Sequence, residues 1–280
     1  MHQGSAHQPR RRLWLFAGTG EGPRLAEALL ALGWRVRVSV VTPAAGRAYD
    51  HLAGVELCTG ALDGAPGLQR ELLQAERHGA PFTLVVDGTH PFALSIRQAL
   101  VTGCGAQGLP LLRLERPHLA DDGAASPVPL LPDLDALRRV PLRGERILLA
   151  IGARRLADAV ACSPGALHHA RLLPSAAALQ QAMAAGLAAE RVACLRPTAG
   201  GAVEEALLKR WGITLILARQ SGGPPEALWR HLALRQGCRL LLLRRPPDPT
   251  GVQGLDQQAL LARLAAWPGP GGTGAAGQDG

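Results

Sequence analysis

The stretch LWLFAGTGEGPRLAEALL, residues 13–30, decides the fold class because it joins an apolar strand to an amphipathic helix through a glycine-rich turn. The run 13–18 predicts a buried strand. Behind the turn, Pro23 suits a first helical turn, and apolar residues recur at helical spacing until Gly33, which suits the helix exit. A buried strand that runs directly into a helix is the repeating unit of a parallel, helix-covered sheet.

The same alternation continues along the chain. Further strands are predicted at residues 35–41, 55–58, 82–88, 109–114, 146–152, 170–173, 191–195, 213–218 and 238–243. Helices fill the intervals, including one over 91–103 and a last one over 255–267. The pattern predicts an α/β protein with two Rossmann-like lobes, parallel sheets and a cleft between the lobes.

Composition suggests the domain boundaries. We expect a disordered N-terminus (1–12), a first Rossmann-like lobe (13–116), a connection rich in Pro, Asp and Ala (117–145), a second α/β lobe (146–267) and a disordered glycine-rich tail (268–280).

The charge balance points to an anionic small molecule as ligand. The formal net charge is +8, and arginine supplies nearly all of the positive charge because Lys209 is the only lysine. Guanidinium groups suit carboxylate- or phosphate-bearing ligands, although codon bias alone explains an arginine-rich chain equally well. Aromatic residues are only 3%, and no dense arginine stripe with interleaved stacking residues occurs, which argues against nucleic acid.

The sequence also argues against a membrane and a metal site. No stretch approaches the about 20 apolar residues of a membrane span, and the start lacks an apolar signal core. The cysteines are widely spaced and odd in number, with no Cys/His cluster at metal spacing: Cys58, Cys104, Cys162, Cys194 and Cys238. We therefore expect buried, reduced thiols, no metal and a cytoplasmic location.

The glycine-rich turn after the first strand is a candidate cofactor site. Its glycines allow close backbone approach, and the N–H groups of the following helix start face whatever lies there, as for a dinucleotide pyrophosphate. A negative charge at Glu21 opposes a phosphate, and an ordinary tight turn is the alternative. The candidate residues are Gly18, Thr19, Gly20, Glu21 and Gly22.

The loop VVTPAAGR, after the second strand, indicates the type of nucleotide. NAD-preferring folds often place an acidic residue here, whereas this chain has Thr42, followed by Gly46 and Arg47. A nearby arginine favours a 2′-phosphate and hence NADPH, with NADH still possible. The alternative is a loop with a solvated arginine.

The stretch VVDGTHPFA, residues 85–93, places Asp87 at the carboxyl end of a strand, where ligands bind in parallel sheets. Because Pro91 disfavours helical geometry at His90, we predict that Thr89 and His90 cap the next helix. Pro91 and Phe92 would then lie in its first turn. Capping alone accounts for Thr89 but not for Asp87 and His90.

Two further motifs suit acidic ligands. In LRLERP, Arg113 and Arg116 flank Glu115, either as a ligand anchor or as a local surface ion pair. In ARQSGG, a small-residue helix start after a strand is suited to anions, as is GARRL at 152–156. The candidate residues of ARQSGG are Ser221, Gly222 and Gly223.

Taken in order, these motifs resemble the precorrin-6A reductase family of cobalamin biosynthesis, including its cobalt-precorrin-6A branch. DGTHPFA together with RLERP carries the resemblance, with GTGEG, the AGR at 45–47 and SGG followed by an apolar strand ending RRP at Pro246. The resemblance spans residues 13–246. It implies two Rossmann-like lobes, and hydride transfer from NADPH to a double bond of an anionic tetrapyrrole, giving the dihydro product.

The resemblance also implies roles for individual residues. NADPH would bind the glycine turn and Arg47, and neighbouring enzymes of the corrin pathway could be partners. His90, with Asp87, is the candidate for the proton transfer, with water an equal alternative. The implied tetrapyrrole contacts are Thr89, His90, Pro91, Phe92, Arg113, Arg116, Ser221, Gly222 and Gly223.

Three departures from the family pattern occur. Gly88 stands where the family usually has alanine. After SGG the family continues towards a lysine, for which Arg230 is the available substitute here. A Gln-Gly-Pro-Phe-like turn is replaced by Arg196, Pro197, Thr198 and Ala199. The contacts of the second lobe are therefore carried over less securely than those of the first.

Rival functions lack matching residues. A short-chain dehydrogenase needs a Tyr-x-x-x-Lys pair, but Tyr49 and Lys209 are the only residues of their types and lie far apart. A two-lobed glycosyltransferase has only the architecture in its favour. A non-catalytic NADPH-binding or nucleotide-sensing module would keep the glycine turn, but it has no need for DGTHPFA or RLERP.

Overall fold

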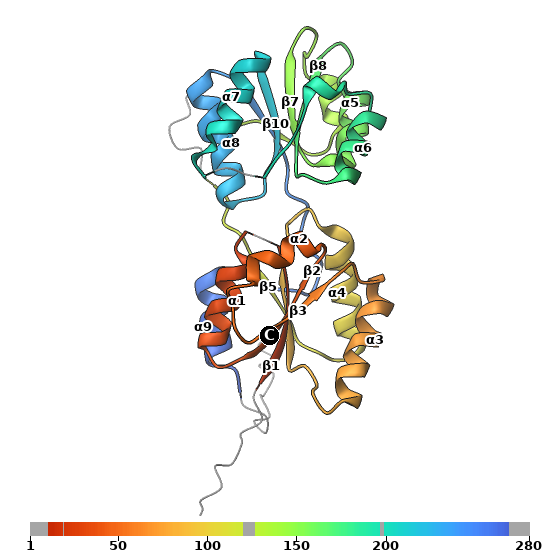
Figure 1. The fold of residues 1–280 in the computed structure, drawn as a ribbon, viewed down its shortest axis with the longest axis vertical. Coiled ribbons are helices and arrows are strands. Elements are labelled where there is room, and N and C mark those ends of the chain that lie inside the picture. The colour runs from red at the N-terminus through yellow and green to blue at the C-terminus, as the bar shows by residue number, and fades with distance from the viewer. Residues whose placement is uncertain (1–10, 19, 120–126, 197–198, 269–280) are drawn as a thin grey trace, which may run out of the picture. The chain divides into compact units, whose positions relative to one another are not determined.

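The computed structural model describes residues 11–18, 20–119, 127–196 and 199–268 (Figure 1). These residues form two compact units. The first contains the described residues up to Arg116 and from Pro247 onward, and the second those from Pro117 to Pro246. Each unit is built on a six-stranded parallel sheet, which confirms the predicted α/β, Rossmann-like class. Within the described ranges, no helix has both the length and the apolar character needed to cross a bilayer.

The first unit has the strand order β12-β5-β4-β1-β2-β3. Its strands are β1 (Arg12–Ala17), β2 (Arg35–Val40), β3 (Val55–Thr59), β4 (Leu84–Gly88), β5 (Leu111–Leu114) and β12 (Gly254–Leu255). Its helices are α1 (Gly22–Ala31), α2 (Pro43–Gly46), η1 (Arg47–Tyr49, a 3₁₀-helix), α3 (Gly64–Arg77), α4 (Leu94–Ala106) and α9 (Gln257–Ala265).

Strand β1 is the centre of this unit because helices cover both of its faces. Helices α1 and α9 lie on one side of the sheet and α3 and α4 on the other (Figure 1). Leu13 and Leu15 pack into the core under α1 and α9, whereas Trp14 and Phe16 pack into the core under α3 and α4. Side chains alternate across a strand, so a strand covered on both faces has a continuous apolar sequence. This explains why the run LWLFA is the strongest strand signal in the chain.

The second unit has the strand order β6-β11-β10-β7-β8-β9. Its strands are β6 (Leu130–Leu131), β7 (Arg146–Ala150), β8 (Leu167–Leu172), β9 (Val192–Cys194), β10 (Leu215–Arg219) and β11 (Arg239–Leu243). Its α-helices are α5 (Leu156–Cys162), α6 (Ala176–Ala184), α7 (Ala202–Trp211) and α8 (Gly223–Gln236), and its 3₁₀-helices are η2 (Asp135–Arg139), η3 (Ala153–Arg155), η4 (Ala189–Arg191) and η5 (Ala199–Gly201).

The last helix belongs to the first unit, so the prediction that places 255–267 in the second lobe is wrong. Strand β12 pairs in parallel with β5, with Leu255 opposite Leu114. Leu260 and Leu264 of α9 are fully buried in the core around β1, and Trp34 Nε1 donates to Leu264 O at 3.3 Å. Helical periodicity predicts a helix here but carries no information about which sheet it covers.

The prediction that segment 117–145 is only a connection between the lobes is wrong. Its β6 pairs in parallel with β11, and its described residues belong to the second unit. A two-residue strand has no periodicity to detect. The predicted disordered ends, 1–12 and 268–280, lie outside the described residues except for Arg11, Arg12 and Pro268, and Arg12 begins β1 rather than being disordered. All five cysteines are free, but only Cys104 and Cys162 are buried, so the prediction of buried thiols is wrong for the half-buried Cys58, Cys194 and Cys238.

Candidate functional site

The predicted motifs of the first unit all leave the same edge of its sheet. Strands β5, β4, β1 and β2 are neighbours in that order. The register places Ala17 opposite Gly88 and Asp87 opposite Arg113. The glycine turn, VVTPAAGR, DGTHPFA and RLERP therefore gather at the carboxyl ends of adjacent strands, where ligands bind in such sheets.

Gly22 is a packing residue of the glycine turn. A Cβ at this position would lie 2.1 Å from Tyr49 Oη and 2.8 Å from Ala17 Cβ. Tyr49 Oη donates a hydrogen bond to Gly18 O at 2.6 Å, and burial raises the pKa of Tyr49, which keeps it a donor. Gly22 thus lets α1 lie close to β1 and lets Tyr49 hold the turn.

Gly18 and Gly20 have a different reason to be glycine. Both are exposed, a Cβ on either would meet nothing within 4 Å, and neither has a positive φ. Neither packing nor backbone conformation requires glycine at these two positions. Because both residues lack a side chain, open space remains beside the carboxyl end of β1. Helix α1 starts at this space with Pro23 in its first turn and no side-chain cap from Glu21. The predicted residue Thr19 lies outside the described residues.

The charge of Glu21 is neutralised by an ion pair. Arg116 Nη2 lies 2.8 Å from Glu21 Oε2, and both side chains are largely buried. The local surface pair between Arg116 and Glu115, which was an alternative for RLERP, is not the one that forms. The pair instead joins RLERP to the glycine turn. Because Arg116 offsets the negative charge of Glu21, this carboxylate does not prevent a phosphate from binding at the turn.

In the loop after β2, the three candidate residues have different surroundings. Thr42 caps α2 by accepting from Ala45 N at 3.2 Å. Gly46 is buried, and a Cβ there would lie 2.9 Å from Leu57 Cδ2, so it is a packing glycine. Arg47 is exposed, and its side chain makes no ion pair with any residue of the described ranges. Arg47 is the residue of this loop that is available to a ligand.

The DGTHPFA turn differs from the prediction. Helix α4 begins at Leu94 with Ala93 as its N-cap, so the prediction that Thr89 and His90 cap it, with Pro91 and Phe92 inside its first turn, is wrong. Side-chain hydrogen bonds hold a separate turn before the helix. Asp87 Oδ1 accepts from Thr89 N at 2.9 Å and from Thr89 Oγ1 at 2.6 Å, and such local bonds compete with helix formation.

His90 is held within this turn. Its Nδ1 accepts from Phe92 N at 3.2 Å, and the two rings lie 5.7 Å apart. The side chain is half-buried. Since Nδ1 is used as an acceptor, the hydrogen-bond pattern assigns the proton of the neutral ring to Nε2. Asp87, by contrast, is only 4% exposed and faces Thr89, which makes it a residue that shapes the turn.

A buried network of charged side chains holds the DGTHPFA turn in place. Arg97, whose side chain is fully buried, donates from Nη1 to Pro91 O and from Nη2 to Asp248 Oδ1, both at 2.6 Å. Arg113 Nη1 lies 3.1 Å from Asp248 and 4.0 Å from Asp87. The predicted ligand anchor Arg113 is thus 3% exposed and lies between two carboxylates. The sequence analysis missed Arg97 and Asp248.

In the second unit, the SGG turn follows β10 and is held by a side chain of helix α8. Gly222 N donates to Glu226 Oε2 at 2.8 Å, and Glu226 Oε1 accepts from Arg230 Nε at 2.8 Å. Gly222 and Gly223 have φ values of 67° and 68°, which favour glycine. Ser221 is buried. Arg230, considered as a substitute for the family lysine, is bound to Glu226 on its own helix.

An arginine cluster lies beside this turn at the ends of β10 and β7, which are paired strands. Arg219 ends β10, and Arg154 and Arg155 lie in η3 directly after β7. Burial, together with the charges of Arg155 and Arg154, lowers the pKa of Arg219 to about 10. Asp158 is the ion-pair partner of Arg155 at 3.0 Å. The motif GARRL suggested this cluster, but the sequence analysis did not single out Arg219.

Two parallel six-stranded sheets with helices between their strands define an α/β protein with two Rossmann-like units. A family model described as "Precorrin-6x reductase CbiJ/CobK" matches residues 12–265. The chain therefore belongs to the precorrin-6x reductase family, and it is an oxidoreductase of cobalamin biosynthesis.

Individual relatives agree with this assignment. The chain is 34% identical over 241 residues to a "Cobalt-precorrin-6A reductase" of Synechocystis sp., covering 85% of this chain and 90% of that one. It is 31% identical to a "Precorrin-6A reductase" of Rhodococcus erythropolis, covering 92% and 97%. The solved structure "CobK precorrin-6A reductase" superposes with a TM-score of 0.71 at 26% identity, covering 91% and 96%.

Proposed function

We propose that this chain reduces precorrin-6A, or its cobalt form, to the dihydro product, with NADPH as the reductant. The observation that carries the proposal is the Glu21–Arg116 ion pair at 2.8 Å. It joins the cofactor-type turn after β1 to the RLERP motif after β5, so the two motifs of the resemblance form one edge of one sheet.

The residues of that edge fit a nicotinamide dinucleotide. Gly18 and Gly20 leave space that side chains would fill, and the N-terminus of α1 offers free N–H groups to a pyrophosphate. Arg47 is exposed beside the end of β2, where a guanidinium suits a 2′-phosphate. When bound, NADPH supplies the hydride.

His90 is the proposed residue that orients the macrocycle, through a hydrogen bond donated from Nε2, and water supplies the proton. Its Nδ1 accepts from Phe92 N, so the ring is neutral, and a neutral imidazole is too weak an acid to give up its Nε2 proton. Asp87, Arg97 and Arg113 are positioning residues, because they hold the turn that carries His90 and have little exposed surface of their own. The role of Thr89 is likewise to shape the turn through Asp87.

Binding of an acidic macrocycle is supported by the cationic loops of the second unit. Arg154 and Arg155 are exposed at the strand ends, and Arg219 lies beside the left-handed glycines of SGG. Guanidinium groups bind carboxylates with paired hydrogen bonds. We propose that this cluster, rather than Arg113, binds carboxylates of the substrate.

The test is an oxidation assay with each cofactor and each substrate form in parallel. Purified protein is mixed with NADPH or NADH and with precorrin-6A or cobalt-precorrin-6A, and cofactor absorbance is followed. We expect oxidation by NADPH that depends on one of the two macrocycles. Tight NADPH binding without oxidation on either would favour the non-catalytic nucleotide-binding module instead.

A further inference from the structure

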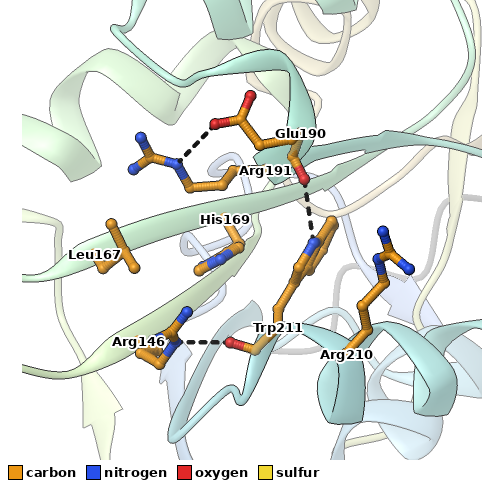
Figure 2. A pocket seen from close by; sticks show the side chains of 7 residues that line it. All are labelled: Arg146, Leu167, His169, Glu190, Arg191, Arg210 and Trp211. Carbon is orange, nitrogen blue, oxygen red and sulfur yellow. Dashed lines mark hydrogen bonds and ion pairs between the residues drawn. The ribbon is translucent and has the colours of Figure 1, made fainter.

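The second unit has a pocket at the end of its sheet opposite to the SGG turn. It has a volume of about 670 Å³ and is lined by Arg146, Leu167, His169, Glu190, Arg191, Arg210 and Trp211 (Figure 2). Arg146 and Leu167 begin β7 and β8, and Arg191 directly precedes β9. The pocket therefore lies at the amino ends of these strands, whereas Arg219 and Ser221 lie at a carboxyl end.

Positive charge in this pocket is not balanced by carboxylates. Within the described ranges, Arg146 and Arg210 form no ion pair. Arg191 Nε lies 3.9 Å from Glu190 Oε1, and the Glu190 side chain is 75% exposed, so this pair is loose and contributes little. Three guanidinium groups around one hollow repel one another unless an anion lies between them.

The floor of the pocket contains a buried polar atom without a partner. His169 is only 2% exposed, and its Nδ1 has no hydrogen-bond partner in the part of the chain that is described. Its ring packs against Trp211 with the centroids 5.0 Å apart (Figure 2). A buried nitrogen of this kind normally has a partner, and a ligand in the pocket would provide one.

Two of the side chains that line the pocket, Arg146 and Trp211, are held in place by hydrogen bonds to the backbone. Arg146 Nε donates to Trp211 O at 2.7 Å, and Trp211 Nε1 donates to Glu190 O at 3.2 Å (Figure 2). These bonds link the start of β7, the end of α7 and η4. The pocket is therefore organised without a ligand, which reduces the entropy that binding has to offset.

We propose that this pocket binds a small oxyanion with two or more negative groups, carried as phosphates or carboxylates. Arg146, Arg191 and Arg210 bind its charged groups, and His169 donates from Nδ1. Burial, with Arg146 and Arg191 nearby, lowers the pKa of His169 to about 4, so the ring is neutral near pH 7 and can carry its proton on Nδ1. The site is distinct from the one proposed for NADPH and the tetrapyrrole.

The test is calorimetric titration of the full chain with inorganic pyrophosphate and, separately, with citrate. We expect saturable binding of at least one probe and a loss of affinity of about tenfold or more in the double variant Arg191→Gln/Arg210→Gln, since two of the three guanidinium groups that bind the anion are lost. The control is Arg235→Gln, an exposed arginine of α8 outside the pocket, whose affinity should match that of the unchanged protein.

The outcomes separate the two ligand chemistries and the proposal itself. Tighter binding of pyrophosphate assigns a phosphate-bearing ligand, and tighter binding of citrate a polycarboxylate. No saturable binding of either probe, or binding that the double variant leaves unchanged, overturns the proposal. Unfolding curves of all three proteins establish that the variants are folded.

A second readout follows His169 directly. The groups that surround its ring are Arg146 from β7, His168 from β8, Arg191 and Glu190 from η4, and Arg210 and Trp211 from α7. A bound anion offsets the guanidinium charges and should raise the pKa of His169, measured by NMR titration of the ring with and without the bound probe. An unchanged pKa at saturating probe would contradict binding in this pocket.

Discussion

The carboxyl edges of the two sheets use arginine in opposite ways. In the first unit, Arg97 and Arg113 are buried against Asp248, and Arg116 is paired with Glu21. In the second unit, the half-buried Arg219 lies beside Arg154 and Arg155, of which Arg155 also pairs with Asp158, and burial together with the two neighbouring charges lowers the pKa of Arg219 to about 10. Paired charges fix a geometry, whereas crowded like charges are stabilised by an incoming anion. The first edge is therefore built to hold turns in place, and the second to receive negative charge.

The largest expected effect comes from opening the buried network. Arg97→Met removes one of the two arginine partners of Asp248, and the donor to Pro91 O, so we expect a loss of about 3 kcal/mol in the free energy of unfolding, together with a lower kcat because His90 is no longer held. Denaturant unfolding and steady-state kinetics measure the two effects.

The matched control for this network is an exposed pair in the same unit. Arg70 and Asp63 lie 3.3 Å apart with both side chains largely exposed, so Arg70→Gln should change stability by less than about 0.5 kcal/mol. Equal losses for Arg97→Met and Arg70→Gln would mean that the buried network does not fix the turn.

The two kinds of glycine in the first turn can be separated. Gly22→Ala forces a Cβ against Tyr49 and Ala17 and should cost about 1–3 kcal/mol of stability. Gly20→Ala has open space, so it should leave the unfolding free energy nearly unchanged and weaken NADPH binding. Unfolding curves and NADPH titrations of both variants measure the two effects. Normal NADPH affinity in Gly20→Ala would show that the turn is not part of the cofactor site.

At the second edge, loss of charge should affect binding rather than folding. Arg154→Gln is expected to leave the unfolding free energy within about 0.5 kcal/mol of the original, because the residue is exposed. The KM for the tetrapyrrole should rise several-fold and approach that of the unchanged protein at high salt, where charge contributes less. A KM that does not respond to Arg154→Gln would show that this edge does not bind substrate carboxylates.

An effect that is absent at neutral pH and emerges only in acid is a pH dependence of stability from His169. Burial first, then Arg146 and Arg191, lower its pKa in the folded protein from 6.5 to about 4, so between these values the unfolded chain binds a proton that the folded chain does not. The stability contribution is complete above pH 6.5 and is lost as the pH falls towards 4. Unfolding midpoints over this range should decline less steeply in His169→Gln; identical slopes would exclude this residue as the source.

Local sequence patterns were sufficient to predict much of the fold and the strand ends at which the candidate site lies. The apolar run of β1, the Pro23 helix start and the glycine before β2 all depend on neighbouring residues, and all three are observed. The positions of the motifs at strand ends follow in the same way, because parallel strands present their carboxyl ends on one edge.

Long-range pairing was not predictable in this way. Arg97 and Asp248 are 151 positions apart, and nothing local marks either as the partner of the other. The return of α9 to the first unit has the same cause, since amphipathic periodicity does not specify the partner sheet. The His90 turn was mispredicted because Asp87 and His90 bond to nearby backbone N–H groups and delay the helix to Leu94.

The central claim is that this chain transfers a hydride from NADPH to the macrocycle. The most direct measurement uses NADPH that carries deuterium at both C4 positions of the nicotinamide, with precorrin-6A and with cobalt-precorrin-6A, followed by mass spectrometry of the tetrapyrrole. We expect a dihydro product that carries one deuterium per molecule, with NADP⁺ formed in equal amount. A product without deuterium, or no product from either substrate while NADPH remains bound, would contradict it.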